Sequence, residues 1–168
     1  SAAGLAATLH PHVGTMVESG EETDRVLAGS RIKLCLDTGH LLIGGGDPVE
    51  VARRWPERIG HMHLKDVRLE VAQQVRSGAL GYADAVRAGM YVPLGAGDVD
   101  VATIVRSLEG AGYTGWYVLE QDTVLPGPLP DTDTGPRADV EASLEHLRAI
   151  AATLPDAEPV DQERMPER

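Results

Sequence analysis

The sequence lacks several features that define whole classes of protein. It contains no phenylalanine, and aromatic residues make up only 4% of its 168 positions, so its core must be built from Leu, Val, Ile and Ala. A single cysteine, Cys35, excludes a disulfide framework within the chain and fits a reducing compartment. No apolar run approaches the roughly 18–20 residues needed to cross a bilayer, and no signal peptide is visible. These absences predict a cytoplasmic protein without a membrane span.

Basic side chains are also scarce. The chain has 15 Lys and Arg against 26 Asp and Glu, which gives a net charge of −11. This excess of negative charge argues against binding to nucleic acid or to an anionic membrane. The hydrophobic content of 42% is sufficient for one domain with a core of its own.

Strand-like and helix-like segments alternate along the chain, which is typical of an α/β fold with a parallel sheet. The predicted strands cover residues 5–13, 32–37, 59–67, 90–94 and 116–120. The predicted helices cover residues 21–28, 49–55, most of 68–89, 101–109 and 140–154. We therefore expect one domain over residues 1–154, followed by a disordered charged tail over residues 155–168.

Histidines and carboxylates collect where the predicted strands end. They are His10, His12, Asp37, His40, His61, His63 and Glu120. In parallel α/β folds, and above all in β/α barrels, the carboxyl ends of the strands are where functional sites are built. A mixed nitrogen and oxygen ligand set suits Mn²⁺, Co²⁺, Mg²⁺ or Zn²⁺ with positions left open for substrate oxygens. The sequence therefore predicts a divalent-metal site with positions open to substrate oxygens.

The spacing of the histidines supports this interpretation. Side chains of a strand alternate between its faces, so His61, His63 and Lys65 share one face, as do His10 and His12. Either histidine pair alone is as well explained by hydrogen-bonded core histidines. Two such pairs, together with an Asp-Thr-Gly-His segment and a final Glu, favour a site.

Four segments carry a resemblance to a known family. They are His10-Pro11-His12-Val13-Gly14-Thr15, Leu36-Asp37-Thr38-Gly39-His40, His61-Met62-His63-Leu64-Lys65-Asp66 and Gly115-Trp116-Tyr117-Val118-Leu119-Glu120-Gln121-Asp122. In this order they resemble the sugar isomerase/epimerase superfamily with xylose-isomerase-like TIM barrels. Within that superfamily they look most like the inosose dehydratases, which dehydrate 2-keto-myo-inositol in inositol catabolism.

The resemblance implies the C-terminal part, about strands 4 to 8, of a (β/α)8 TIM barrel with parallel strands. A complete barrel takes about 250 residues, so three further β/α units are expected upstream. The 168 residues alone are then expected to be inactive. A partial barrel also leaves open sheet edges, which favour association, and a homo-oligomer is compatible with the sequence.

The resemblance also implies a ligand set. The superfamily usually holds its metal with Glu, Asp, His and Glu from successive strands. The residues that match the second, third and last of these ligands are Asp37, His63 and Glu120. The first Glu is replaced by a His-Pro-His segment, so His10 is the expected first ligand, with His12 or Glu18 as alternatives.

The remaining roles follow from the same resemblance. Mn²⁺ or Co²⁺ is the expected metal, with Mg²⁺ or Zn²⁺ as alternatives, and the substrate is a sugar or cyclitol ketone that reacts through an enediolate. Glu120 is the expected base and His40 or Lys65 the acid, while His12, His40, His61 and Lys65 contact the substrate. A helix cap for His40 and a salt bridge for Lys65 are alternative roles.

Three functions stay open at this point. The first is an inosose dehydratase, the second is a sugar or sugar-phosphate isomerase or epimerase on the same metal site, and the third is an inactive barrel fragment.

Structural roles are expected for three neighbouring features. Asp66 faces away from Lys65 and is expected to cap or pair, Trp116 is expected in the core, and the glycines of Gly95-Ala96-Gly97 are expected in a plain turn.

Overall fold

The centre of the molecule is a four-stranded parallel sheet with the strand order β1-β2-β3-β6. The structure is a computed structural model that describes residues 4, 6–125, 127–128 and 134–155. The elements are, in chain order, β1 (Thr8–Leu9), α1 (Gly20–Gly29), β2 (Lys33–Asp37), α2 (Thr38–Ile43), α3 (Pro48–Arg54), a 3-10 turn η1 (Pro56–Arg58), β3 (Ile59–Leu64), β4 (Asp66–Val67), α4 (Leu69–Arg76), α5 (Tyr82–Arg87), β5 (Tyr91–Val92), α6 (Val101–Gly110), β6 (Tyr117–Leu119) and α7 (Pro136–Ala151).

The pairing of β2 with β3 fixes which side chains meet at the end of the sheet. Leu34 lies opposite Ile59, but Cys35 lies opposite His61, so β3 carries one extra residue, Gly60, at this point. Such a β-bulge shifts the register of every later pair. After the bulge Asp37 lies opposite His63, so the two share one face of the sheet.

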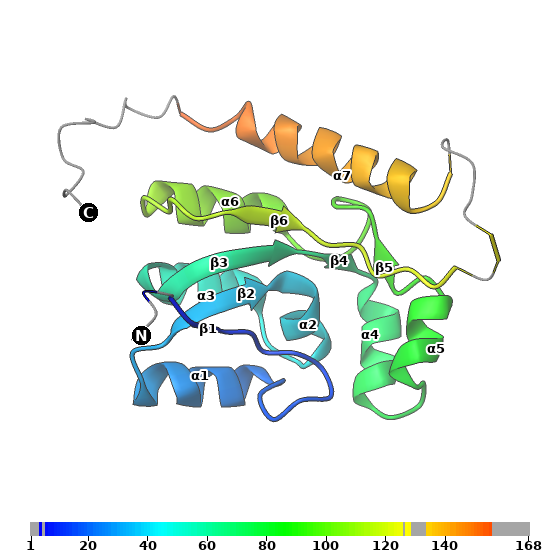
Figure 1. Ribbon diagram of the computed structural model, residues 1–168, viewed down its shortest axis with the longest axis horizontal. Coiled ribbons are helices and arrows are strands. Elements are labelled where there is room, and N and C mark those ends of the chain that lie inside the picture. The colour runs from blue at the N-terminus through cyan, green and yellow to red at the C-terminus, as the bar shows by residue number, and fades with distance from the viewer. Residues whose placement is uncertain (1–3, 5, 126, 129–133, 156–168) are drawn as a thin grey trace.

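Helices cover one face of the sheet and bury its apolar side chains. α3 packs against α6, and α7 packs against α6 and β6. In α6 the apolar residues recur at the spacing of one helical face, as the sequence predicts, and the buried ones are Val101, Ile104, Val105 and Leu108. In Figure 1 α1 lies below β1 and α7 above β6, toward opposite edges of the sheet, and α4 and α5 lie beyond the ends to which the strand arrows point.

Several predicted elements differ from the structure. The strand predicted over residues 5–13 is assigned only as β1, the strand predicted over residues 59–67 is divided between β3 and β4 in two sheets, and the helix α2 was not predicted. The strand predicted over residues 90–94 forms as β5, but it pairs antiparallel with β4 in a separate two-stranded sheet. The reason is that α4 and α5 return the chain to where it left β4. Trp116 was predicted in the core and is 76% exposed, because it precedes an edge strand with no further strand beside it in the described part of the chain.

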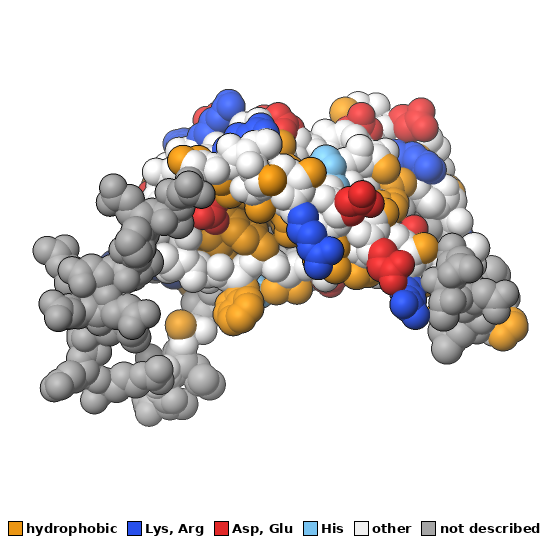
Figure 2. Space-filling model, turned by 90° about the horizontal axis from the view of Figure 1, so that it is seen from above, with side chains coloured by type: hydrophobic (Ala, Val, Ile, Leu, Met, Phe, Trp, Pro, Cys, Tyr) orange, Lys and Arg blue, Asp and Glu red, His pale blue; other side chains and the backbone are white. Residues whose placement is uncertain are grey.

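The architecture agrees with the expected α/β class and with a parallel sheet that is part of a barrel, with four strands in that sheet. The predicted tail over residues 155–168 lies, apart from Pro155, outside the described residues. Across the described ranges, no helix is both long and apolar enough to cross a membrane. On the face seen in Figure 2, acidic, basic and apolar side chains are interspersed and neither charge forms a continuous patch.

Candidate metal centre at the carboxyl ends of the strands

Asp37 connects the local fold to the centre of the site. It ends β2 and caps the first turn of α2, where its Oδ1 accepts a hydrogen bond of 2.8 Å from the backbone N–H of His40. Its Oδ2 is left pointing at two imidazoles, 3.4 Å from Nε2 of His10 and 3.7 Å from Nδ1 of His63. The Asp37 side chain is completely buried. The cap therefore fixes one carboxylate oxygen and presents the other to the cluster.

The four predicted metal ligands converge at this point. Nδ1 of His63 lies 2.7 Å from Oε2 of Glu120. One ligand atom each from Asp37, His63 and Glu120 all lie within 4.8 Å of one another. A second group of this kind joins His10 and His63 to the sulfur of Cys35.

Five buried polar atoms of this cluster make no hydrogen bond of regular geometry among the described residues, although four of them lie within ion-pair distance of another charged or imidazole group. The five atoms are Nε2 of His10, Oδ2 of Asp37, Nδ1 of His40, Nδ1 of His63 and Oε2 of Glu120. A buried polar group that makes no hydrogen bond costs roughly 1–3 kcal/mol, so native proteins rarely keep several in one place. Four of these atoms belong to the four predicted ligands. Their nitrogen and oxygen donors fit a divalent cation.

Lys65 lies at the centre of a network of opposite charge. Its Nζ is 3.3 Å from Oδ2 of Asp37 and 3.3 Å from Oε1 of Glu120. It is 2.9 Å from Oδ2 of Asp122 and 3.0 Å from Nε2 of His40. Only 1% of the Lys65 side chain is exposed. Three carboxylates thus surround one buried ammonium group.

The segment Thr38-Gly39 holds Lys65 in place. The hydroxyl of Thr38 donates to the backbone oxygen of Lys65 at 2.6 Å and accepts from its backbone N–H at 2.9 Å. A Cβ atom on Gly39 would lie 2.7 Å from Cβ of Lys65, closer than real Cβ contacts come. In the Asp-Thr-Gly-His segment, Asp37 therefore caps α2, Thr38 hydrogen-bonds to the backbone of Lys65, and Gly39 allows close contact with the lysine side chain.

Burial and neighbouring charges shift the pKa values of the cluster. Burial by itself raises the pKa of Asp37, but the imidazoles and the ammonium around it outweigh this and hold the pKa well below its usual range. Burial lowers the pKa of His40 to about 4, so this imidazole is neutral at pH 7. The Asp37 carboxylate raises the pKa of His63. Burial opposes the charge on Lys65, but the surrounding carboxylates raise its pKa, so Lys65 stays protonated.

The other predicted substrate contacts lie at the rim of the cluster. The ring of His12 packs on that of His40 with centroids 3.6 Å apart. The ring of His61 meets that of His63 edge-on at 5.2 Å. The remaining histidine, His146, lies on α7 against Gly95. The structure therefore brings all the predicted site residues together and keeps His146 apart from them.

Three residues near Lys65 were not among the predicted site residues. Asp122 bonds to Lys65 as described, and it could have been found because it follows Glu120 at strand spacing. Tyr82 and Tyr91 lie beside His40, with ring centroids 6.3 Å away in each case. Only the return path of α4 and α5 places these tyrosines, and no sequence signal pointed to it.

Asp66 has the structural role expected for it. Its buried carboxylate accepts hydrogen bonds from the backbone N–H groups of Val67, Gly95, Gly97 and Val99, at 2.8 to 3.0 Å. The loop after β5 is thereby fixed to the residue that follows Lys65. Lys65 and Asp66 point to opposite sides of the chain. Lys65 points into the site, and Asp66 points toward the loop after β5.

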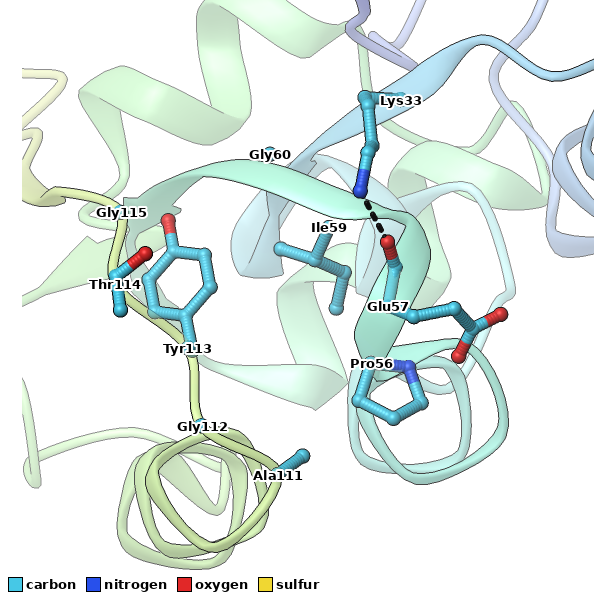
Figure 3. Close-up of a pocket in the computed structure, with 10 residues that line it drawn as sticks. All are labelled: Lys33, Pro56, Glu57, Ile59, Gly60, Ala111, Gly112, Tyr113, Thr114 and Gly115. Atoms are coloured by element: carbon cyan, nitrogen blue, oxygen red, sulfur yellow. Dashed lines mark hydrogen bonds between the residues drawn. The ribbon is translucent and has the colours of Figure 1, made fainter. Parts of the chain in front are cut away.

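A separate pocket lies at the opposite, amino ends of the strands. It has a volume of about 300 Å³ and is lined by ten residues, among them Lys33, Ile59, Tyr113 and Gly115. Figure 3 shows the Lys33 ammonium turned to the backbone oxygen of Glu57, to which it donates a hydrogen bond. The pocket lacks the converging carboxylates and imidazoles of the other end, so it does not belong to the metal centre.

Comparisons with known proteins agree with this architecture. A family model described as "Xylose isomerase-like TIM barrel" matches residues 2–150. The chain is 42% identical over 121 residues to the rhizopine catabolism protein MocC of Rhizobium meliloti, covering 71% of this chain and 37% of that protein. It is 38% identical over 131 residues to the inosose dehydratase of Geobacillus thermodenitrificans, covering 75% and 44%. The chain thus spans less than half the length of these relatives.

Solved structures show the same fold. The chain resembles an IOLI protein crystallised with a bound zinc atom, with a TM-score of 0.60 and 15% identity over 91% of this chain and 51% of that one. It also resembles the probable 3-DHS dehydratase AsbF of Bacillus anthracis, with a TM-score of 0.57 and 22% identity over 84% and 48%. At these identities the likeness concerns the fold alone. It is consistent with about half of a barrel.

Proposed function

The chain belongs to the xylose isomerase-like TIM barrel family, and from this premise we propose that it supplies the metal centre of an inosose dehydratase. The observation that carries the proposal is the set of buried atoms without regular hydrogen bonds on the four predicted ligands. The similarity to inosose dehydratases at 34–40% identity supports the choice of reaction. The substrate would be 2-keto-myo-inositol, a polyhydroxylated cyclic ketone.

Asp37, His63, Glu120 and His10 would hold the divalent ion. A bound ion of this kind supplies Lewis acidity, which draws electron density from a carbonyl oxygen and makes the neighbouring C–H bond more acidic. We propose Mn²⁺ or Co²⁺, since the two imidazoles and two carboxylates form a mixed nitrogen and oxygen set. The solved IOLI structure contains zinc, which keeps Zn²⁺ as an alternative.

The protein's own residues account for the movement of protons. The side chain of Glu120 is 38% exposed, the most of the four proposed ligands and the more exposed of the two carboxylates. In this proposal it takes the proton from the carbon next to the carbonyl group, which leaves an enediolate. Glu120 lies within 3.3 Å of Lys65, so the base and the ammonium act on the same substrate face.

Lys65 and the neutral His40 would assist departure of the β-hydroxyl as water. Lys65 is protonated and buried, and its three N–H groups already face four acceptors, on Asp37, Glu120, Asp122 and His40. To act as the acid it would give up one of these contacts and transfer that proton to the leaving oxygen, and Glu120, 3.3 Å away, would return to it the proton taken from carbon. His40 accepts from Lys65 through Nε2, which leaves the proton of its neutral ring on Nδ1. Nδ1 is buried and makes no hydrogen bond in the described chain, so a substrate oxygen that contacts the ring would be the acceptor for its proton. His12 and His61 would complete the wall of the site.

An assay of the complete polypeptide that the gene encodes tests the proposal. The protein is stripped with EDTA, reloaded with Mn²⁺ or Co²⁺, and incubated with 2-keto-myo-inositol and, separately, with a panel of ketoses. We expect the dehydrated diketone from the inosose, loss of activity on stripping and recovery on reloading. Conversion of a ketose without any diketone would assign the site to an isomerase or epimerase instead, and activity that survives complete stripping would exclude the metal centre.

The 168 residues alone are proposed to be inactive. Four parallel strands are half of the eight that close a β/α barrel, so half the wall around the substrate is missing from the chain as described. Measuring this chain beside the complete polypeptide in the same assay tests the point. Equal turnover by the two proteins would show that the half barrel is sufficient.

A further inference from the structure

Two tyrosine hydroxyls border the site without any role in the function proposed above. Tyr82 starts α5, and Tyr91 lies in β5. Their hydroxyl oxygens are 2.9 Å apart. Both belong to the segment that runs from β4 through α4 and α5 to β5. The two-stranded β4-β5 sheet lies beyond the carboxyl ends of the parallel strands (Figure 1).

The tyrosine pair is packed directly against the residues of the site. Tyr91 is only 6% exposed, and Nζ of Lys65 lies 5.4 Å from the centre of its ring. The ring of Tyr82 lies nearly parallel to that of His40, at an angle of 25°. A Cβ on Gly39 would come within 3.1 Å of Cε1 of Tyr91. Neither ring can move far without disturbing Lys65 or His40.

A count of hydrogen bonds leaves one of the two hydroxyls with a free proton. Within the pair one hydroxyl donates and the other accepts, and neither has another hydrogen-bond partner in the part of the chain that the structure describes. Tyr91 is buried, so its proton has no solvent to reach, whereas Tyr82 is half-buried. Either hydroxyl could donate across this contact; donation by the buried Tyr91 leaves the proton of the more exposed Tyr82 available to a ligand.

The electrostatics of the pair agree with this direction. Burial raises the pKa of both tyrosines, and the bond between them lowers the pKa of Tyr82 while it raises that of Tyr91, as expected when Tyr91 donates. The charges that act on Tyr82 are those of Asp122, Lys65 and Asp37. The geometry places the pair beside the site, because the Tyr82 ring lies 6.3 Å from the His40 ring and Nζ of Lys65 lies 5.4 Å from the Tyr91 ring.

We propose that Tyr82 is a specificity-determining residue, whose hydroxyl donates a hydrogen bond to a substrate hydroxyl remote from the reacting carbonyl. With His40 and Asp122, which both contact Nζ of Lys65, it would form a polar wall of the site. Such a wall selects a polyhydroxylated ring or chain over a small keto acid, because a donor that a bound ligand covers but does not pair penalises a ligand that lacks the hydroxyl. This inference rests on the proposed function and specifies which part of the substrate is recognised.

Calorimetric titration of the metal-loaded complete polypeptide with myo-inositol tests the inference, since this polyol has the hydroxyls but not the ketone. We expect Tyr82→Phe to weaken binding roughly three- to tenfold, the usual effect of one hydrogen bond, with unchanged metal affinity. Tyr113→Phe is the matched control, because it removes a hydroxyl at the opposite end of the strands, where the hydroxyl bonds to the backbone oxygen of Trp116. It is expected to bind like the wild type.

A second variant separates recognition from packing. Tyr91→Phe keeps the Tyr82 hydroxyl and is expected to weaken binding less than Tyr82→Phe. The inference is overturned if the wild type does not bind myo-inositol, if Tyr82→Phe binds it as the wild type does, or if Tyr82→Phe also loses metal affinity. If the wild type forms no diketone from the inosose, the proposed function fails, but weaker polyol binding by Tyr82→Phe would still support the inference.

Discussion

At the carboxyl ends of the parallel strands charged side chains are buried together, whereas at the amino ends polar side chains are exposed or bonded to the backbone. The side chains of Asp37 and Lys65 are 0% and 1% exposed, and several atoms around them make no regular hydrogen bond in the described chain. At the other end the exposed Lys33 donates to a backbone oxygen, as does Tyr113. Burial of unpaired polar atoms lowers stability, so the carboxyl end keeps an arrangement that folding alone does not favour.

The largest expected difference between the two ends is in stability. Asp37→Ala should lower the free energy of unfolding of the metal-free protein by about 3–5 kcal/mol, because it removes one partner from a buried ionic cluster. Lys33→Ala, a charge removed at the exposed end, should change it by less than about 0.5 kcal/mol. Urea unfolding followed by circular dichroism measures both. Similar losses for the two variants would contradict the contrast between the ends.

The second expected difference between the carboxyl and amino ends of the strands is in the effect of substitutions on metal affinity. His63→Gln should weaken Mn²⁺ or Co²⁺ binding by more than about 100-fold, beyond the effect typical of residues that only support a ligand. Glu57→Gln neutralises a carboxylate beside the pocket at the amino ends and should leave the affinity unchanged. Competition with a chromophoric chelator gives both values. If the His63 variant binds as tightly as the Glu57 variant, the ion is held elsewhere.

The smallest expected effect is the loss of stability when either of two glycines, each with little room for a Cβ atom, is replaced by alanine. A Cβ on Gly97 would fall inside contact distance of the Asp66 carboxylate, and a Cβ on Gly115 inside that of the Tyr113 hydroxyl. The carboxylate is buried and fixed by four backbone N–H groups, whereas the hydroxyl ends a partly exposed ring that can swing away. We expect Gly97→Ala to cost about 1–3 kcal/mol and Gly115→Ala less than about 1 kcal/mol. Thermal unfolding ranks them, and a larger loss for Gly115→Ala would reverse the comparison.

The sequence was informative where the chemistry follows the strand period. Asp37, His63 and Glu120 could be placed together because each ends or follows a strand, and the carboxyl ends of parallel strands meet at one edge. The role of Asp66 followed from the same alternation, since it must face away from Lys65. The ligand assignments themselves stay predictions until a metal is bound and measured.

The rest depended on contacts between segments with no shared pattern. Tyr82 and Tyr91 reach Lys65 only because the chain returns through α4 and α5 to pair β5 with β4. The same return took the strand predicted over residues 90–94 out of the parallel sheet. The exposure of Trp116 was missed for a related reason, since the sequence does not reveal whether an edge strand has a neighbour.

The bulge in β3 has a consequence for how the His-Met-His segment is read. If the offset of Leu34 from Ile59 continued unchanged, Asp37 would lie beside Met62, which is fully buried among the apolar side chains of the core. The two imidazoles would then lie out of register with Asp37, although the sequence of the segment would be unchanged. Gly60, which has no side chain and lies close to Cβ of Lys33, sets that register. Whether His61 and His63 face the site therefore depends on Gly60, which lies outside the His-Met-His segment.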